Sequence, residues 1–205
     1  MRIAAGALCC SLSPAASAQD AGRLVAIQQR KYQLSHELLI GGMVEPQDAF
    51  SKGVALEGAY IWHFSDLWSW EVLRGGYLAQ LDTGLKTQLL RDFGTDPTQF
   101  ESLQYYASSS LTYAPLYGKF ALRNASLIHA EAFLNFGAAF GRFTSSYQAG
   151  PEVGVGLRVF LSQALSLRFD ARDAVFLRRK TNSGFVNQAL FFSLGLSIAL
   201  GGTPR

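Results

Sequence analysis

Acidic and basic side chains that could pair, or take part in acid–base chemistry, recur along the chain, often at even spacing. They are Glu37, Glu57, Glu71, Glu131, Glu152, Arg158, Arg168, Asp170 and Arg172. A guanidinium group is planar and can donate two parallel hydrogen bonds to one carboxylate. Because unpaired charges are very costly to bury, the residue types favour a network of ion pairs.

Histidines beside these acids offer catalysis as an alternative. His129 with Glu131, or His36 beside Glu37, could orient a base for a nucleophilic serine. No serine lies in the G-x-S-x-G pattern of a nucleophile elbow. We therefore predict a non-enzymatic protein without catalytic residues.

Metal binding is a further alternative, because His63, His129 and a nearby carboxylate could together bind zinc. Such a site needs strands that bring the three side chains face to face, and spacing alone does not indicate this. Both cysteines, Cys9 and Cys10, lie near the N-terminus inside a predicted leader. We predict no metal site and no cofactor.

The elements that position these charges have a period of two from Gln33 onward, which is typical of strands. Over residues 54–64, Val54, Leu56 and Tyr60 share one face, while Glu57 and His63 share the other. The expected strands span residues 33–44, 54–64, 68–81, 105–115, 127–143, 151–161, 165–177 and 185–200. In each, one face suits lipid and the other is small or polar.

Composition is consistent with a membrane barrel. Of 205 residues, 49% are hydrophobic and only 16% are charged, yet no apolar run reaches the roughly 18 residues of a spanning helix. An open sheet edge cannot persist in hydrocarbon, so the strands must close. We predict an all-β fold, an eight-stranded antiparallel up-and-down transmembrane β-barrel.

The N-terminal residues have the features of a secretory signal. Arg2 precedes an apolar stretch, and Ala16-Ser17-Ala18 forms a small-residue cleavage pattern. We expect a signal peptide over 1–18, a periplasmic lead-in over 19–32 and an outer-membrane barrel over 33–205. The net charge of +3, with signs interspersed, excludes nucleic acid as an expected partner.

The predicted connections alternate between short and long, as periplasmic turns and external loops do. Residues 65–67 and 162–164 are tight turns, whereas 45–53, 82–104, 144–150 and 178–184 are longer. The segment 116–126 is too long for a minimal periplasmic turn. Residues 83–93 carry the pattern of a short amphipathic helix.

Three smaller features refine the prediction. Aromatic residues that suit a membrane boundary bracket the first tight turn: Trp62, Phe64, Trp68 and Trp70. Arg74 and Asp173 break the lipid-facing parity of their strands, which indicates a bulge, a register shift or proximity to the interface. Glycine pairs at 137 and 141 and at 154 and 156 lie inside strands, where barrel curvature and close packing favour them over a phosphate-binding loop.

Four stretches resemble a family of small outer-membrane barrel proteins of myxobacteria and their relatives, broadly similar to OmpA-like transmembrane barrels. They span residues 63–72, 82–86, 115–120 and 154–173, from His63-Phe64-Ser65-Asp66 to Asp170-Ala171-Arg172-Asp173. The resemblance implies no catalytic residues, and it suggests a role in envelope-spanning machinery.

Barrels of this kind also end in an insertion signal, which Ser193, Gly195, Ile198 and Leu200 resemble, although the usual terminal aromatic is absent. The resemblance thus implies the barrel-assembly machinery as a partner during insertion.

The leading hypothesis is a structural or scaffold component of the cell envelope, with outer-membrane lipid and envelope proteins as partners. The alternatives are an outer-membrane lipid-modifying enzyme, a small-solute channel, and a soluble lipocalin-type barrel with its apolar face inside. A general porin is disfavoured, because eight strands enclose only enough space for side chains.

Overall fold

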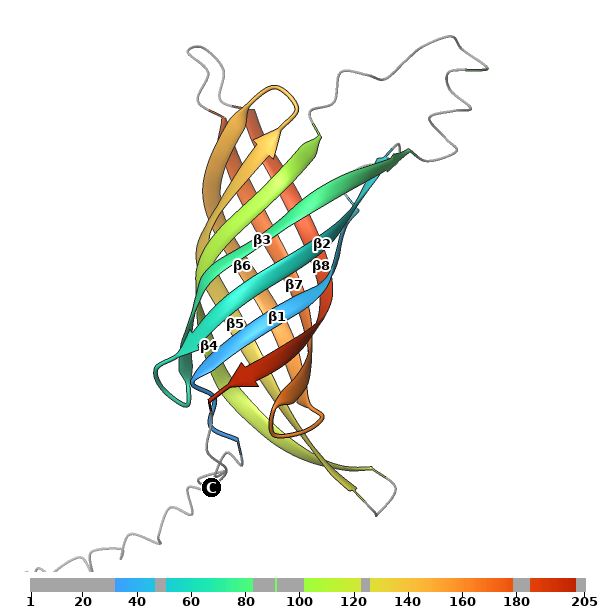
Figure 1. The fold of residues 1–205 in the computed structure, drawn as a ribbon. Coiled ribbons are helices and arrows are strands. Elements are labelled where there is room, and N and C mark those ends of the chain that lie inside the picture. Colours follow the sequence, from blue (N-terminus) through green and yellow to red (C-terminus); the bar gives the residue numbers. More distant parts are fainter. Residues whose placement is uncertain are drawn as a thin grey trace, which may run out of the picture.

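The computed structural model describes residues 32–46, 51–82, 91, 102–122, 126–178 and 185–201. Eight antiparallel strands form a closed barrel in which each strand pairs with its neighbours in the sequence and β1 pairs with β8 (Figure 1). The strands are β1 (His36–Glu45), β2 (Ser51–His63), β3 (Trp68–Asp82), β4 (Leu103–Leu122), β5 (Ser126–Phe143), β6 (Tyr147–Phe160), β7 (Leu165–Arg178) and β8 (Phe185–Leu200). The predicted fold class is confirmed.

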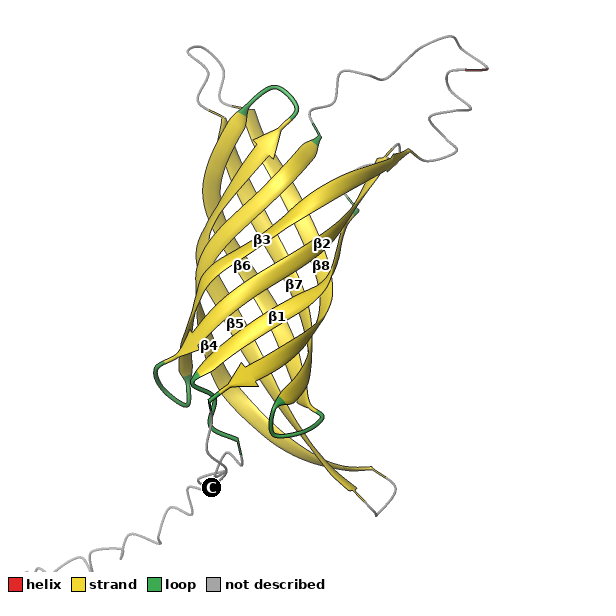
Figure 2. Cartoon of the chain, viewed as in Figure 1, coloured by secondary structure: helices red, strands yellow, loops and turns green. Residues whose placement is uncertain are grey.

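Strands dominate the described chain (Figure 2). Within these residues, no helix is long and apolar enough to cross a membrane. The helix predicted over 83–93 lies outside the described residues apart from Arg91, as does the leader.

Alternate side chains point to opposite sides of the barrel wall, as the period of two predicts. Along β8, Leu194, Leu196 and Ile198 face outward and are about half exposed, whereas Ser193 and Ser197 are buried inside. The same division on the other strands gives the barrel an apolar outer wall, called here the apolar belt, and a lumen that contains its charged residues. Soluble globular proteins have the opposite arrangement.

Both ends of the described chain lie at one end of the barrel, called here the terminal end. There Ser35 N–H donates to the Gly201 carbonyl at 3.1 Å, and β1 begins where β8 ends. The turns 64–67 and 161–164 lie at this end (Figure 1), as expected for short turns. The opposite end, where β2, β4, β6 and β8 begin, is called the far end.

Strand β4 differs most from its predicted limits, since it continues to Leu122 instead of ending at 115. Pairing with β5 shifts by one residue between Tyr113 and Leu116, which places Pro115 at a β-bulge. Proline lacks the N–H that a central strand needs and is confined to edges and bulges. The long segment 116–126 is therefore mostly strand, and it extends the β4–β5 hairpin beyond the wall.

A second bulge lies in β3. Against β2, Tyr60 pairs with Leu73 and Ile61 with Glu71, and the register against β4 shifts over the same residues. The extra residue reverses the side-chain alternation. Glu71 and Arg74, three residues apart, both point into the lumen, so a bulge accounts for the parity break at Arg74.

Candidate functional site: the filled lumen

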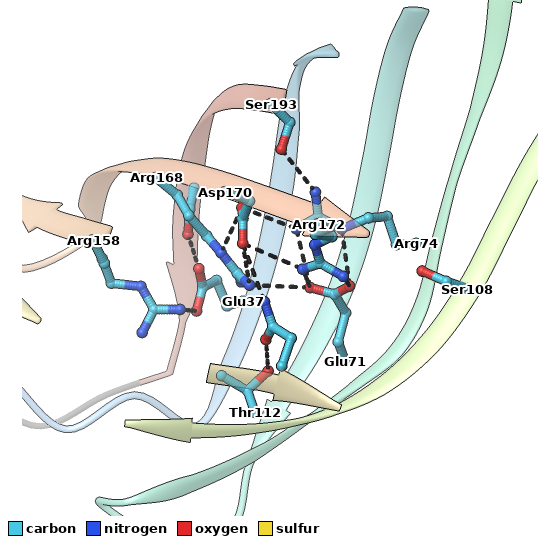
Figure 3. A network of polar contacts seen from close by, with 12 residues as sticks. Glu37, Glu71, Arg74, Ser108, Thr112, Arg158, Arg168, Asp170, Arg172 and Ser193 are labelled. Atoms are coloured by element: carbon cyan, nitrogen blue, oxygen red, sulfur yellow. Dashed lines mark hydrogen bonds and ion pairs between the residues drawn. The ribbon is translucent and has the colours of Figure 1, made fainter. Parts of the chain in front are cut away.

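The lumen near the terminal end is filled by a buried ion-pair network, called here the charged layer (Figure 3). Its acids and arginines come from six strands and are all less than 5% exposed. They are Glu37, Glu57, Glu71, Arg74, Glu131, Arg158, Arg168, Asp170 and Arg172, with Glu152 at the border towards the far end. All nine residues predicted for the interior network thus lie inside the barrel.

Glu71 is the acceptor for three guanidinium groups. Arg74 donates to both carboxylate oxygens at 2.9 and 3.1 Å, and Arg172 does so at 2.8 and 3.0 Å. Arg168 adds a further bond at 3.2 Å. Two of these contacts have the bidentate geometry that makes Arg–carboxylate pairs strong.

Arg74 extends the network around the lumen. Its Nη1 donates to Glu57 at 2.9 Å and to the Ser193 hydroxyl at 3.3 Å, and its Nη2 donates to Asp170 at 3.3 Å. Arg74 thereby connects β3 with β2, β7 and β8. Without the bulge its side chain would face the apolar belt.

Arg158 forms a second centre nearer to the terminal end. It donates to Glu37 at 2.7 Å and to Glu131 at 2.9 Å. Glu37 also lies 2.7 Å from His63 Nε2 and accepts a hydrogen bond from the Ser197 hydroxyl. In a catalytic triad the histidine lies between serine and acid. Here the acid lies between serine and histidine, so this histidine does not contact the serine hydroxyl.

The other histidines have different surroundings. His129 points inward and has its ring 5.7 Å from that of Tyr32 and 5.9 Å from that of Tyr117. His36 is exposed on the outer wall, where it stacks on Tyr60 and lies 2.9 Å from the Tyr60 hydroxyl. Among the described residues, no cluster of three His, Cys, Asp or Glu side chains could hold a metal ion.

The lumen toward the far end is filled by apolar side chains, called here the apolar layer. Its members are Met43, Ala55, Leu78, Leu103, Tyr106, Ala139, Phe143, Ala174, Phe176, Ala189 and Phe191. Phe143 and Phe176 meet edge to face at 5.3 Å, a favourable aromatic geometry. Tyr106 joins the two layers, because its ring packs 4.8 Å from that of Phe191 and its hydroxyl donates to Glu152.

The N-terminal residues cross the mouth of the lumen at the terminal end. Ser35 accepts from His63 N–H at 2.8 Å beside β1, while the Tyr32 ring lies 5.4 Å from Phe160 of β6. Beneath this segment, a polar cavity of about 20 Å³ is lined partly by Glu131 and Arg158. Its volume suits about one water molecule.

The aromatic residues predicted for a membrane boundary are exposed around the turn 64–67. Trp62, Phe64, Trp68 and Trp70 are each between 37% and 52% exposed. The indole of Trp70 also donates to the Ser109 hydroxyl at 3.1 Å. These side chains form one aromatic group at the terminal end of the apolar belt.

The four residues of the predicted insertion signal are divided between the two faces of β8. Ser193 and Gly195 face the lumen, and Ile198 and Leu200 are about half exposed on the outer wall. Gly195 lies opposite Gly41 of β1, and a Cβ at Gly41 would come 2.6 Å from the Gly195 Cα. Small residues are therefore needed where β1 and β8 close the barrel.

Sequence reasoning missed several interior residues. For Arg74, the sequence contained one indication, a charged residue at a position that the alternation of its strand assigns to the lipid-facing side. For Tyr106 and Asn135, only the alternation of their strands indicated an inward position. Asn135 accepts from Thr112 at 2.7 Å and donates to Asp170 at 3.4 Å.

Asp173, the other parity break, does face outward. The register there is regular, and its carboxylate accepts from Gln188 at 2.7 Å. The regular register excludes a bulge or a register shift at Asp173, whose partners on the neighbouring strands, Val153 and Leu190, are exposed apolar residues of the outer wall.

Glycines in β6 allow close packing in the charged layer. A Cβ at Gly156 would collide with the Phe133 ring, which itself lies 4.4 Å from the Arg168 guanidinium carbon. A Cβ at Gly154 would lie 2.8 Å from Arg172. The close-packing interpretation of this pair agrees with the geometry.

No model of a known protein family matches the chain, and no curated protein matches it. Several solved structures are similar to it. The N-terminal β-barrel domain of Pseudomonas aeruginosa OprF has 11% identity and a TM-score of 0.42, covering 82% of this chain and 99% of that one. Neisserial surface protein A has 12% identity and a TM-score of 0.44, covering 80% and 97%. Ail of Yersinia pestis has 12% identity and a TM-score of 0.36, covering 82% and 100%.

The matched part of OprF is a β-barrel domain, and another similar structure is that of the outer membrane protein OprG from Pseudomonas aeruginosa. At such identity, likeness concerns the fold alone, and no family model supports the narrower resemblance to myxobacterial proteins. The functional conclusion therefore depends on the lumen and the outer wall of this chain.

Proposed function

We propose that the chain is an integral outer-membrane β-barrel that acts as a structural or scaffold component of the cell envelope. An apolar outer wall with charges inside is stable in lipid and unstable in water, which also disfavours a lipocalin-type carrier. In this proposal residues 1–18 direct export, the terminal end faces the periplasm and the far end faces outside. The signal at 193–200 would be recognised by the barrel-assembly machinery.

The observation that carries the scaffold role is the filled lumen. An ion-pair network and an apolar layer occupy successive levels, and Tyr32 covers the mouth at the terminal end. A conducting pore requires a continuous hydrated path, which these side chains obstruct. Partners would then bind to surfaces outside the barrel, as in the envelope machinery that the myxobacterial resemblance suggests.

Conductance in planar lipid bilayers tests this proposal directly. The full chain, inserted into a bilayer, is expected to give no stepwise current, because neither layer leaves room for hydrated ions. A porin at the same protein-to-lipid ratio serves as the positive control. Sustained unitary currents would favour the small-solute channel instead.

A further inference from the structure

The ends of β4 and β5 form a two-stranded ribbon that reaches beyond the barrel wall, defined here as residues 115–122 and 126–132. Pairing of β3 with β4 ends at Trp68 and Tyr113, followed by one bond at 2.8 Å from Ala114 N–H to the Leu67 carbonyl. Pairing of β5 with β6 begins only at His129 and Phe160. Among the described residues, no third strand pairs with 115–122 or with 126–128 of the ribbon.

The two faces of the ribbon have different surroundings. Leu116 and Phe120 are 67% and 62% exposed, and they continue the outward face that carries Leu111 and Leu134 on the wall. On the inward face, Tyr117 is buried, with its ring 6.3 Å from that of Phe160. Exposed apolar side chains of the ribbon therefore lie on the same face as the apolar belt.

The position of the ribbon at the end of the apolar belt indicates what covers that face. The ribbon extends past the other strand ends at the terminal end (Figure 1), and its outward face continues the apolar belt, which is the lipid-facing surface in the function proposed above. Exposed apolar side chains of a segment beside a membrane bury at the boundary between head groups and acyl chains.

We propose that the ribbon lies on the periplasmic surface of the membrane, with Leu116 and Phe120 at the boundary between head groups and acyl chains. The occupant of this face is the phospholipid surface, and the inference depends on the membrane location proposed above. Open strand edges cannot enter hydrocarbon, but water satisfies them at head-group level. A partner protein that added a strand would use the edges and would leave Leu116 and Phe120 in water.

Depth-dependent fluorescence quenching tests this placement. In the full chain with Cys9 and Cys10 replaced by serine, single cysteines are introduced as Leu116→Cys, Phe120→Cys, Lys119→Cys or Leu194→Cys. Each variant carries an environment-sensitive fluorophore and is folded into phosphatidylethanolamine and phosphatidylglycerol vesicles, with or without brominated acyl chains. Lys119 is the matched control on the opposite face, and Leu194 reports on the belt.

Brominated lipid is expected to quench the fluorescence of the labels at 116, 120 and 194 to a comparable degree, and to reduce the fluorescence of the label at 119 only slightly. If 194 is quenched while 116 and 120 behave like 119, the ribbon lies in water or against protein. That result overturns the inference and leaves the membrane location intact. If 194 itself is not quenched, the membrane location and the inference fall together.

Discussion

The charged layer and the apolar layer fill the same lumen with opposite chemistry. In the charged layer, four guanidinium groups and their carboxylate partners are held by directed hydrogen bonds across the barrel. In the apolar layer, side chains such as Phe143 and Phe176 touch without directed bonds. The stability of the charged layer therefore depends on the complete set of ion-pair partners, whereas that of the apolar layer depends mainly on the volume that its side chains fill.

This difference follows from the cost of burial. A buried charge without its partner is expensive, so loss of one member of the network destabilises all the groups that it contacted. A truncated apolar side chain leaves a cavity, and its cost grows with the volume that neighbours cannot refill. The same barrel thus allows both kinds of defect to be compared within one lumen.

The largest expected effect is that of Glu71→Gln, which keeps the shape of the side chain and removes its charge. Three guanidinium groups would lose the negative charge and one of the two acceptor oxygens that they share, and the new amide NH2 group would face their donors, so we expect the free energy of unfolding to fall by about 3–5 kcal/mol. Urea titration of the protein folded in lipid vesicles, followed by tryptophan fluorescence, measures the change. Glu57→Gln is the matched control, because within the part of the chain that the structure describes Glu57 pairs only with Arg74, through one oxygen at 2.9 Å. Equal losses for the two variants would contradict the shared-acceptor role of Glu71.

A smaller effect is expected in the apolar layer for Phe176→Ala. Loss of the fully buried ring leaves a cavity beside Phe143 and should cost about 3 kcal/mol. The same urea titration measures it, with the exposed Leu177→Ala as the control on the outer wall. If Phe176→Ala destabilised the protein more than Glu71→Gln, the contrast between the two layers would be reversed.

Much of this fold was predictable because the period of two assigns each residue to a face. Predicted strands match β7 and β8 to within one residue, and the nine predicted network residues lie inside. Arg74 was not among the predicted network residues because one extra residue in β3 reverses the alternation of side chains. The position of that extra residue is set by the pairing of β3 with β2 and β4. The full length of β4 was not predicted for a similar reason. Pro115 indicates a strand end unless the bulge in the pairing with β5 is known.

The division of the lumen into two layers was harder to predict than its lining. Parity shows that Phe133 and Phe143 of β5 both point inward, but it does not show their neighbours on other strands. The antiparallel register decides that Phe133 meets arginines while Phe143 meets Phe176.

The sequence also contains Glu45, which is buried near the far end with no hydrogen-bond partner for either oxygen in the described chain. Nothing in its spacing separates it from the paired acids.

The smallest expected effect concerns shape within the charged layer, at Gly156. The added methyl group of Gly156→Ala would collide with the Phe133 ring, which packs against the guanidinium groups of Arg158 and Arg168. Displacing this ring should cost about 1–2 kcal/mol through overpacking, which is less than the loss of a charge partner. The matched control is Gly58→Ala, where the nearest atom to the new Cβ would be the Leu39 carbonyl oxygen at an ordinary 3.6 Å. Unfolding free energies from urea titration should fall for Gly156→Ala and stay nearly constant for Gly58→Ala. A neutral Gly156→Ala would mean that the ring can move without disturbing the ion pairs, and the charged layer would then depend on its hydrogen bonds alone.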